Sequence, residues 1–435
     1  MSAIVGGDRL PSTRALAAEL EVSRGVAHHA YDQLTAEGWI EGRIGSGTFV
    51  TTDIPVRPRP APAAATSSTE DDGLAPVVLR PGIPWTPPRP SAAWRRAWRI
   101  AGAEPAPHDY PAPAGPLALR RSVCALLARA RGMTVEPERV VVTTGAVHGL
   151  TLALAALRPP ESAPTPVLAV EDPGYRVAVS AAVAVGWHVH DVPVDRGGVV
   201  VDALRFAPDS TRAVYVTPSH QYPTGGTLDG RRRAALVAHA RDTDTVVIED
   251  DYDSEFRYDV APLPALAHLD ADRVVYLGTI AKTIGAGVRL GWMVLPTHLV
   301  EPVLRHRIAV GDYPSTPLCV AATSLLDDGE WDRLVRAARR RYRDRDAAVW
   351  DSLSEFGELR GSGAGMHTTL VLSPERADAV ARGAAARGVE VPTDAQSARS
   401  HPDPGGLVIG YGRLTDDRLR TALDVLVDEL RRHRD

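Results

Sequence analysis

The sequence predicts an α/β protein whose open, mostly parallel sheet is preceded by a small, separate head. Short apolar runs, such as those at 140–142, 213–216 and 274–276, alternate with amphipathic stretches of helical length. That alternation is typical of a sheet whose strands are joined by crossover helices and whose ligands bind at the carboxyl ends of the strands. Two short helical patterns and two strand-like segments come first, separated from the rest by a stretch rich in proline and alanine.

Composition limits the classes of protein to consider. Of 435 residues, 44% are hydrophobic and 24% are charged, so most of the chain should bury a core. The net charge of −5 gives no general attraction to nucleic acid, and any DNA contact must come from a local patch. No apolar stretch is long enough to span a bilayer, and no signal peptide is visible. Cys124 and Cys319 show no metal spacing, so we expect a cytoplasmic protein with reduced thiols and no bound metal.

Residues 52–76 are dominated by proline, alanine, serine and acidic residues. Such a composition cannot bury enough apolar surface to fold, and its prolines favour an extended backbone. We therefore expect a flexible linker at 52–76, between a head at 1–51 and a body at 77–435.

The head has the pattern of a winged helix-turn-helix. Ser12 is placed to cap one helix, Ser23 is placed to cap a second at 24–37, and Gly38 would end that second helix. The positions expected to face inward are Leu16, Leu20, Val26, Ala30 and Leu34. Residues 39–50 then predict two short strands with a glycine-rich tip. This order of elements places the second helix in a major groove. The alternative is a helical protein-interaction module.

On these residues the head resembles the GntR family of bacterial repressors. The match runs through GDRLPSTRALAAEL, VSRG and AYDQLTAEGWIEGRIGSGTFV, and the family's first helix, ahead of GDRLPS, is missing here. The resemblance implies that arginines at the helix starts and on the wing contact DNA, that serines donate to phosphates, and that glycines shape the wing along the minor groove. The implied DNA-binding residues are Ser12, Arg14, Ser23, Arg24, Arg43, Gly45 and Gly47. Acidic residues outnumber arginines in the head, so these arginines must form a local patch.

Lysine occurs once in the chain, at Lys282, although the sequence holds 49 basic residues in all. The guanidinium groups that make up the rest do not deprotonate and cannot act as amine nucleophiles. GC-rich coding explains a bias toward arginine, but it does not explain why one lysine survives. An amine able to form a Schiff base has therefore been kept at a single position.

Four segments that follow predicted strands share one feature: they could bind different parts of a single ligand. The turn at 143–148 can offer backbone N–H groups to a phosphate, and 171–175 ends in a tyrosine whose ring can lie on a planar ligand. The segment 249–255 holds five acids and could bind a cationic nitrogen, while 279–289 brings together a hydroxyl, an amine and a guanidinium. Each segment alone is compatible with an ordinary turn or a solvated acidic cluster. A ligand that uses all four is pyridoxal 5′-phosphate.

From about Leu79 to the C-terminus the body resembles the fold-type I aminotransferases. Together with the head, the chain resembles the MocR subfamily of GntR regulators. The phrases that carry this resemblance are VTPSHQYPTGG, VIEDDYDSEFRYD, PLPAL, YLGTIAKT and VRLGWMVLP. It implies a pyridoxal phosphate-binding body with a mostly parallel central sheet and a smaller C-terminal α+β subdomain.

The resemblance also implies a role for each site residue. Lys282 would form the internal aldimine, Asp250 would pair with the protonated pyridine nitrogen, Tyr252 would bond the phenolic oxygen, and Tyr175 would stack on the ring. The residues implied for the phosphate are Gly145, Ala146, Val147, Thr279 and Arg289, with Tyr110 reaching the phosphate of a dimer partner. Tyr222, within 219–223, would line the cofactor edge. The residues better regarded as structural are Asp251, Asp253 and Glu255.

One departure from the family bears on the ligand. Near the C-terminus the family usually has Leu-Arg-Leu-Gly-Phe-Ala, whose arginine grips an amino acid carboxylate. Here LVIGYG places Val408 at that position, and Arg413 lies on the other side of Tyr411. We therefore expect no simple amino acid held by the usual clamp. The ligand would be pyridoxal phosphate itself or a small amine compound without a free carboxylate there.

The sequence thus predicts a pyridoxal phosphate-dependent, DNA-binding transcriptional regulator that senses its ligand through the aldimine at Lys282. The alternative is a catalytic aminotransferase with a vestigial head. The missing arginine argues against that alternative, because transamination needs repeated, oriented binding of amino acids. A residual transaminase half-reaction stays compatible with the regulator. An empty scaffold is disfavoured because Asp250, Tyr252 and Arg289 are retained. We expect a head-to-tail homodimer whose heads contact two half-sites of a promoter operator.

Overall fold

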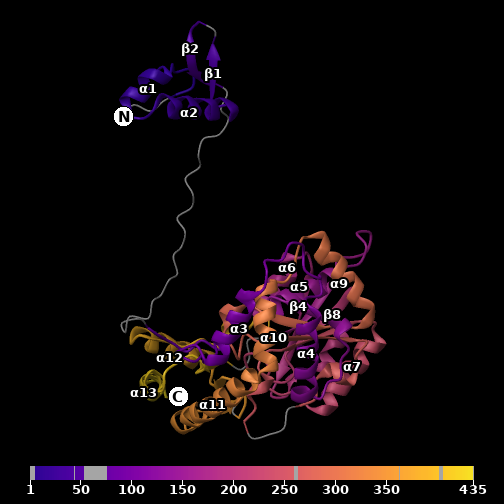
Figure 1. Cartoon of the computed structure of the whole chain (residues 1–435). Helices are drawn as coiled ribbons and strands as arrows, with labels where there is room; N and C mark the ends of the chain where they lie inside the picture. The colour runs from indigo at the N-terminus through magenta and orange to yellow at the C-terminus, as the bar shows by residue number, and fades with distance from the viewer. Residues whose placement is uncertain are drawn as a thin grey trace. The chain divides into compact units, whose positions relative to one another are not determined.

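A computed structural model describes residues 5–43, 45–52, 76–258, 263–361, 363–400 and 405–434 (Figure 1). The chain divides into two compact units, Met1–Asp71 and Asp72–Asp435. The linker predicted at 52–76 lies outside the described residues except for its first and last positions.

The smaller unit has the predicted order of helix, turn, helix and hairpin. Its elements are α1 (Thr13–Glu19), α2 (Arg24–Ala36), β1 (Ile40–Arg43) and β2 (Gly47–Val50). The hydroxyl of Ser12 accepts from the N–H of Ala15 at 3.2 Å, and that of Ser23 accepts from the N–H of Val26 at 3.3 Å, so both predicted N-caps are confirmed. The strands pair antiparallel, which confirms the hairpin.

The inward faces predicted for the two helices are partly wrong. Leu20 and Val26 are 59% and 58% exposed, and Ala30 is exposed as well. The buried or half-buried positions are Thr13, Leu16, Ala17, Ala27, Tyr31 and Leu34. The buried row of α2 starts one residue later than predicted, because Tyr31 fills the inner side and its hydroxyl donates to Pro11 O at 2.7 Å.

The larger unit is built on an eight-stranded sheet in the order β4-β11-β10-β9-β8-β5-β6-β7. The strands are β4 (Val140–Thr143), β5 (Val167–Asp172), β6 (His188–Asp195), β7 (Gly198–Val199), β8 (Thr211–Val216), β9 (Val246–Asp251), β10 (Val274–Thr279) and β11 (Gly291–Val294). The run from β10 through β9, β8 and β5 to β6 is parallel, whereas β11 is antiparallel to both of its neighbours. The predicted mostly parallel sheet is confirmed.

Helices cover both faces of this sheet (Figure 1). They are α3 (Ala92–Ala103), α4 (Leu117–Arg131), α5 (Ala146–Ala156), α6 (Arg176–Ala184), α7 (Gly230–Asp242), α8 (Leu266–Leu269), α9 (Thr297–Ala309) and α10 (Thr316–Asp327). One apolar core joins a sheet face to α3, α4, α7 and α10, and a second joins the opposite face to α5, α6 and α9. Because successive side chains of a strand point to opposite faces, neighbours on one strand belong to different cores.

The predicted smaller C-terminal α+β subdomain is also present, with its own apolar core. Its elements are α11 (Glu330–Leu353), β12 (Leu359–Arg360), β13 (His367–Val371), α12 (Pro374–Ala386), β14 (Val389–Glu390), β15 (Gly406–Gly410) and α13 (Asp416–Arg432), joined by β3 (Val77–Val78), which pairs with β14. The antiparallel order is β12-β13-β15. In the described part of the chain, no helix combines the length and the apolar character that crossing a membrane requires.

Candidate cofactor pocket and DNA-binding head

A cavity of about 370 Å³ opens at the carboxyl ends of β8, β9 and β10, beside the N-terminus of α5. Every predicted cofactor-binding residue lines it except Tyr110: Gly145, Ala146, Val147, Tyr175, Tyr222, Asp250, Tyr252, Thr279, Lys282 and Arg289. The remaining lining residues are Arg80, Pro81, Gly82, Ile83, Val177, Tyr215, Thr217 and Ala281. The parallel sheet therefore brings together segments that lie far apart in the sequence.

Lys282 follows β10 and turns its amine into this cavity. Its Nζ donates to Gly82 O at 2.6 Å. Burial lowers the pKa of Lys282, while the nearby carboxylate of Asp250 opposes this effect. A lowered pKa increases the neutral fraction of an amine, which is the form that attacks an aldehyde.

Asp250, at the end of β9, has one satisfied and one unsatisfied oxygen. Its Oδ2 accepts a short hydrogen bond from the hydroxyl of Tyr215 on the neighbouring strand β8. Its Oδ1 is buried and has no hydrogen-bond partner among the described residues. Burial raises the pKa of Asp250 to about 6. A cationic N–H placed in the cavity would supply the missing donor and favour the ionised carboxylate.

The opposite end of the cavity suits a phosphate. The helix α5 starts at Ala146, and its first backbone N–H groups and helix dipole favour an anion. Gly145 has φ 129°, a backbone conformation that residues with a side chain rarely adopt, and the Arg289 guanidinium lies next to it. Arg289 itself has a left-handed backbone, with φ 55°. Such a strained conformation persists where the surroundings enforce it, often at functional sites.

Three tyrosines form the aromatic wall. The rings of Tyr175 and Tyr222 meet edge to face with centroids 5.7 Å apart. The hydroxyl of Tyr252 donates to His220 O at 2.9 Å and lies 3.2 Å from His220 Nδ1. That nitrogen is 2.8 Å from Asp253 Oδ2. Asp253 and His220 therefore fix the position of the Tyr252 hydroxyl.

His220, Asp253 and His367 are also the one group among the described residues whose side chains could share a metal ion, with ligand atoms within 4.8 Å of one another. Asp253 already bonds His220 directly, and both residues are fully enclosed. Burial lowers the pKa of His367 well below its ordinary value. His220 contacts the Tyr252 hydroxyl and Asp253 contacts His220, so these contacts hold Tyr252 in place.

The acids next to Asp250 lie outside the cofactor cavity and have partners of their own. Asp251 Oδ2 is 2.9 Å from Arg131 Nε and accepts from the Tyr276 hydroxyl at 2.6 Å. Glu255 accepts from the Thr283 hydroxyl at 3.0 Å. These contacts agree with the structural role expected for the acids.

Tyr110 lies apart from the other predicted residues. It is 77% exposed and stacks on Tyr313 with ring centroids 4.9 Å apart. Within one chain it does not reach the cofactor cavity.

Sequence reasoning missed Tyr215 and Arg80. Tyr215 lies within an ordinary apolar strand, and only the pairing of β8 with β9 brings it to Asp250. Arg80 follows the short strand β3 and adds a third cation to the cavity, with Lys282 and Arg289. No sequence motif marks either residue.

The expected loss of a carboxylate clamp stays a prediction, and the structure shows where the two residues concerned lie. Val408 is buried in β15 opposite Thr369 and does not line the cavity. Arg413 is exposed and does not line the cavity either.

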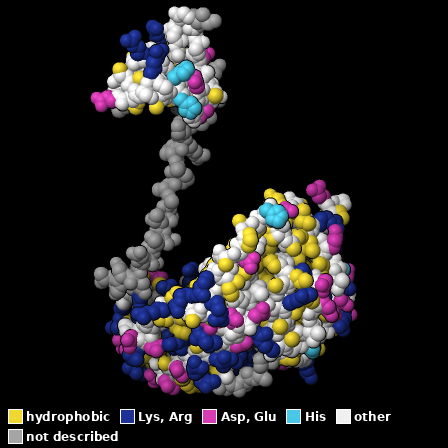
Figure 2. Space-filling model, in the orientation of Figure 1, with side chains coloured by type: hydrophobic (Ala, Val, Ile, Leu, Met, Phe, Trp, Pro, Cys, Tyr) yellow, Lys and Arg dark blue, Asp and Glu magenta, His cyan; other side chains and the backbone are white. Residues whose placement is uncertain are grey.

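The head exposes the arginines that the sequence assigned to DNA. Arg14 and Arg24 are exposed and have no acidic partner in the described part of the chain. Arg43 on β1 pairs with Glu41 at 2.7 Å and lies over the Phe49 ring at 4.8 Å. The predicted wing glycines, Gly45 and Gly47, both have positive φ, as the turn between β1 and β2 requires. On the face of the head that Figure 2 shows, basic side chains gather together, away from the histidines visible there. A local basic patch thus exists despite the acidic net charge.

Comparisons with known proteins identify both units. Residues 85–425 match the family "aminotransferase class I and II", and residues 3–50 match "bacterial regulatory proteins, gntR family". The chain is 37% identical to the HTH-type pyridoxine biosynthesis transcriptional regulator PdxR of Corynebacterium glutamicum, over 97% of this chain and 91% of that protein. It is 30% identical to the probable rhizopine catabolism regulatory protein MocR of Rhizobium meliloti, over 96% and 88%. An archaeal alanine:glyoxylate aminotransferase shares the fold, with a TM-score of 0.74 and 23% identity over 83% of this chain and 92% of that one.

The head and the pocket together define a DNA-binding transcriptional regulator whose body is built like a pyridoxal phosphate enzyme. The chain belongs to the aminotransferase class I and II family and, with its GntR head, to the MocR subfamily of regulators. Its cofactor is pyridoxal 5′-phosphate, and the pocket fits this group: an unpartnered carboxylate oxygen at one end, a helix N-terminus and an arginine at the other, and the amine of Lys282 between them. When bound, the cofactor supplies an electrophilic aldehyde and an electron-withdrawing ring.

Proposed function

We propose that this regulator senses pyridoxal phosphate itself and adjusts transcription to the supply of that cofactor. The observation that carries the proposal is Val408, a buried aliphatic residue where the family places the arginine for an amino acid carboxylate. A site that keeps its cofactor contacts and lacks the substrate clamp suits a protein for which the cofactor is the signal. The name of the Corynebacterium glutamicum relative, which refers to pyridoxine biosynthesis, supports this choice.

Within this proposal, the head spans 1–51, the linker 52–76 and the sensing body 77–435. Lys282 attaches the ligand, Asp250 accepts from the ring nitrogen, and Tyr252 is aimed at the phenolic oxygen. Tyr175 and Tyr222 enclose the ring. The phosphate is held by Gly145, Ala146, Val147, Thr279 and Arg289. Ligand binding then favours one of two arrangements that differ in DNA affinity.

The working form that we propose is a head-to-tail homodimer. Tyr110 supports it, because a large tyrosine is 77% exposed and does not reach the cavity of its own chain. In a dimer this ring could complete the phosphate site of the partner. Two heads would contact two half-sites of a promoter operator, with Arg14, Arg24 and Arg43 at the DNA. Since its operator DNA is the partner, we expect the protein to act in the cytoplasm.

The test is a titration of the full-length protein against its own upstream region, followed by fluorescence anisotropy. Pyridoxal phosphate should change the operator affinity at least several-fold, and common amino acids added to the loaded protein should cause no further change. Tight calorimetric binding of an amino acid to the loaded protein, lost in Arg413→Ala, would contradict the proposal. Failure of pyridoxal phosphate to alter operator affinity would contradict it as well.

Arg80 favours a second candidate, a catalytic aminotransferase. It lines the cavity and could hold a substrate carboxylate in place of the missing arginine. Steady turnover of an amino donor with a 2-oxo acid above roughly 1 s⁻¹, lost in Arg80→Ala, would establish that function.

A further inference from the structure

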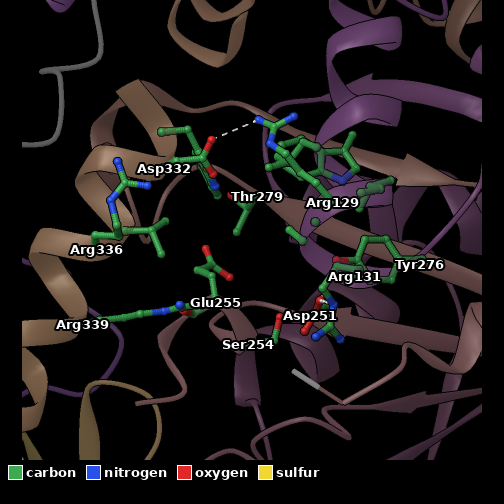
Figure 3. A pocket seen from close by; sticks show the side chains of 17 residues that line it. Arg129, Arg131, Asp251, Ser254, Glu255, Tyr276, Thr279, Asp332, Arg336 and Arg339 are labelled. Atoms are coloured by element: carbon green, nitrogen blue, oxygen red, sulfur yellow. Dashed lines mark hydrogen bonds and ion pairs between the residues drawn. The ribbon is translucent and has the colours of Figure 1, made fainter. Parts of the chain in front are cut away.

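A second cavity, of about 400 Å³, lies between α4 and α11, and we refer to it as the α4–α11 cavity (Figure 3). Its lining residues are Leu126, Leu127, Arg129, Ala130, Arg131, Asp251, Ser254, Glu255, Tyr276, Gly278, Thr279, Trp292, Trp331, Asp332, Val335, Arg336 and Arg339. Among the residues that the structure describes, Thr279 alone lines both this cavity and the cofactor pocket. The two cavities are therefore neighbours across the end of β10.

The charges around the α4–α11 cavity leave an excess of positive charge. Arg129 pairs with Asp332 at 3.4 Å, as the dashed line in Figure 3 shows, and Arg131 pairs with Asp251. Arg336 is exposed and has no acidic partner in the described part of the chain, and Arg339 donates only to a backbone oxygen. Glu255 does not balance them at neutral pH, because burial raises its pKa to about 8.

Buried polar atoms without partners border the same cavity. Arg131 Nη1, Asp251 Oδ1 and Trp292 Nε1 are enclosed and have no hydrogen-bond partner among the described residues. The side chains of Arg131 and Asp251 are only 5% and 1% exposed. Because leaving such atoms unpaired costs about 1–3 kcal/mol each, a ligand or ordered water is expected to satisfy them.

The rest of the wall is apolar and aromatic. The rings of Trp292 and Trp331 meet edge to face with centroids 6.4 Å apart, and Val335 and the leucines of α4 surround them. Two tryptophans beside two unneutralised arginines form a site with an apolar end and a cationic end.

We propose that the α4–α11 cavity binds a small organic anion with an apolar body, whose carboxylate contacts Arg336 and Arg339 and whose body packs on Trp292 and Trp331. This second ligand site goes beyond the proposed function, since the sensing of pyridoxal phosphate does not require it. In Figure 3 Arg336 and Arg339 lie on one side of the cavity, where Arg339 contacts Glu255, and Arg131 lies on the other side.

The position of the cavity connects it to the cofactor pocket. Asp250 and Asp251 are consecutive on β9, one pointing into each cavity. Thr279 lines both, and Lys282 follows three residues later. A ligand in the α4–α11 cavity that shifts Asp251 or Thr279 would therefore change the surroundings of Lys282. The expected readout is a shift in the visible absorption of the loaded protein.

The experiment uses the full chain loaded with pyridoxal phosphate, with phenylacetate as the probe and neutral phenylacetamide as its matched control. Binding is followed by calorimetry and by tryptophan fluorescence, to which Trp292 and Trp331 contribute among the eight tryptophans of the chain. Phenylacetate should bind with one site per chain, and phenylacetamide should bind at least about tenfold more weakly, because a charge-assisted contact is lost. Arg336→Gln should weaken phenylacetate binding by a similar factor. Arg340→Gln, which removes an exposed arginine of the same helix outside the cavity, should leave it unchanged.

Arg336 is exposed, so its substitution should not disturb folding. Arg339→Gln is a second variant that should also weaken the binding of phenylacetate. The inference is wrong if phenylacetate shows no binding below about 10 mM. It is also wrong if the acid and the amide bind equally, or if Arg336→Gln and Arg340→Gln have the same effect. The visible spectrum that tests cofactor binding and the anisotropy that tests DNA binding are both measured without phenylacetate, so the proposed function is judged separately.

Discussion

Asp250→Asn tests the central electrostatic feature of the cofactor pocket. The substitution keeps the size of the side chain and leaves an oxygen to accept from Tyr215, so the fold should be retained. It removes the negative charge that we expect to face a protonated ring nitrogen. A hydrogen bond to a charged group contributes about 1.5–3 kcal/mol, so the affinity for pyridoxal phosphate should fall about 10- to 150-fold.

The pH dependence of binding gives a second, independent magnitude. In the free protein, burial raises the pKa of Asp250 to about 6, so its carboxylate is ionised above that pH and protonated below it. Affinity that depends on the ionised carboxylate should therefore fall as the pH is lowered through 6, by up to tenfold per pH unit. Asp250→Asn should lack this step, and the difference between the two profiles cancels the titration of the cofactor itself.

The assay is equilibrium binding of pyridoxal phosphate, followed by absorption between pH 5 and pH 8. Asp378→Asn, which removes an exposed carboxylate on α12, serves as the matched control and should behave like the parent protein. Equal affinity and the same pH profile for Asp250→Asn and the parent would refute the assignment of Asp250 to the ring nitrogen.

Four further predictions concern the amine, the missing clamp, the head and the buried acid. Lys282→Ala should lose the visible band of the lysine-bound cofactor, and borohydride reduction with peptide mapping should find no modified residue. A modified residue in this variant would show that the cofactor attaches somewhere other than Lys282. Because Val408 is buried, Val408→Arg is first checked for folding by circular dichroism; the folded variant should respond to amino acids in the operator anisotropy assay, and an unchanged response would show that position 408 does not control ligand choice. Arg24→Ala should weaken operator binding by about 1–3 kcal/mol if it reads a base, or lower the salt dependence by about one ion if it contacts a phosphate; unaltered binding would remove it from the interface. Burial raises the pKa of Glu255 to about 8 in the folded protein. The contribution of this group to the free energy of unfolding is therefore fully present below its ordinary pKa, and it is lost as the pH rises through 8. In the cofactor-free protein, the free energy of unfolding measured with urea should therefore fall less between pH 6 and pH 9 for Glu255→Gln than for the parent. The same pH profile for the two proteins would contradict this.

The sequence allowed the sheet and the cofactor pocket to be predicted for a physical reason. In a parallel sheet the carboxyl ends of strands meet at one edge, so motifs after separate apolar runs must converge. Asp250 and Lys282 end or follow adjacent strands, β9 and β10, and both line one cavity. Local capping was predictable as well, because Ser12 and Ser23 bond N–H groups only three residues away.

Contacts between segments that are distant in the sequence were harder to predict. The bond from Tyr215 to Asp250 depends on the order of β8 and β9 in the sheet, which no local pattern records. The inner face of α2 was shifted by one residue because few apolar side chains mark it and the large ring of Tyr31 decides the packing. Arg131 and Asp251 form a buried pair although they lie far apart in the sequence. The acidic segment therefore indicated a site without showing which acid faced it.

The strand β9 explains how one acidic segment can serve two cavities. Side chains alternate across a strand, so Asp250 faces the cofactor pocket and Asp251 faces the α4–α11 cavity. Each acid is buried, and each has one oxygen satisfied by a tyrosine hydroxyl, from Tyr215 or Tyr276, and one oxygen without a hydrogen-bond partner among the described residues. A buried carboxylate with a free acceptor is costly unless a donor arrives. Asp251 differs from Asp250 in one respect: Arg131 Nε lies 2.9 Å from its Oδ2 and balances its charge within the protein, so an ordered water is enough to satisfy the remaining oxygen. The pair Asp250→Asn and Asp251→Asn would show whether the two cavities respond to different ligands.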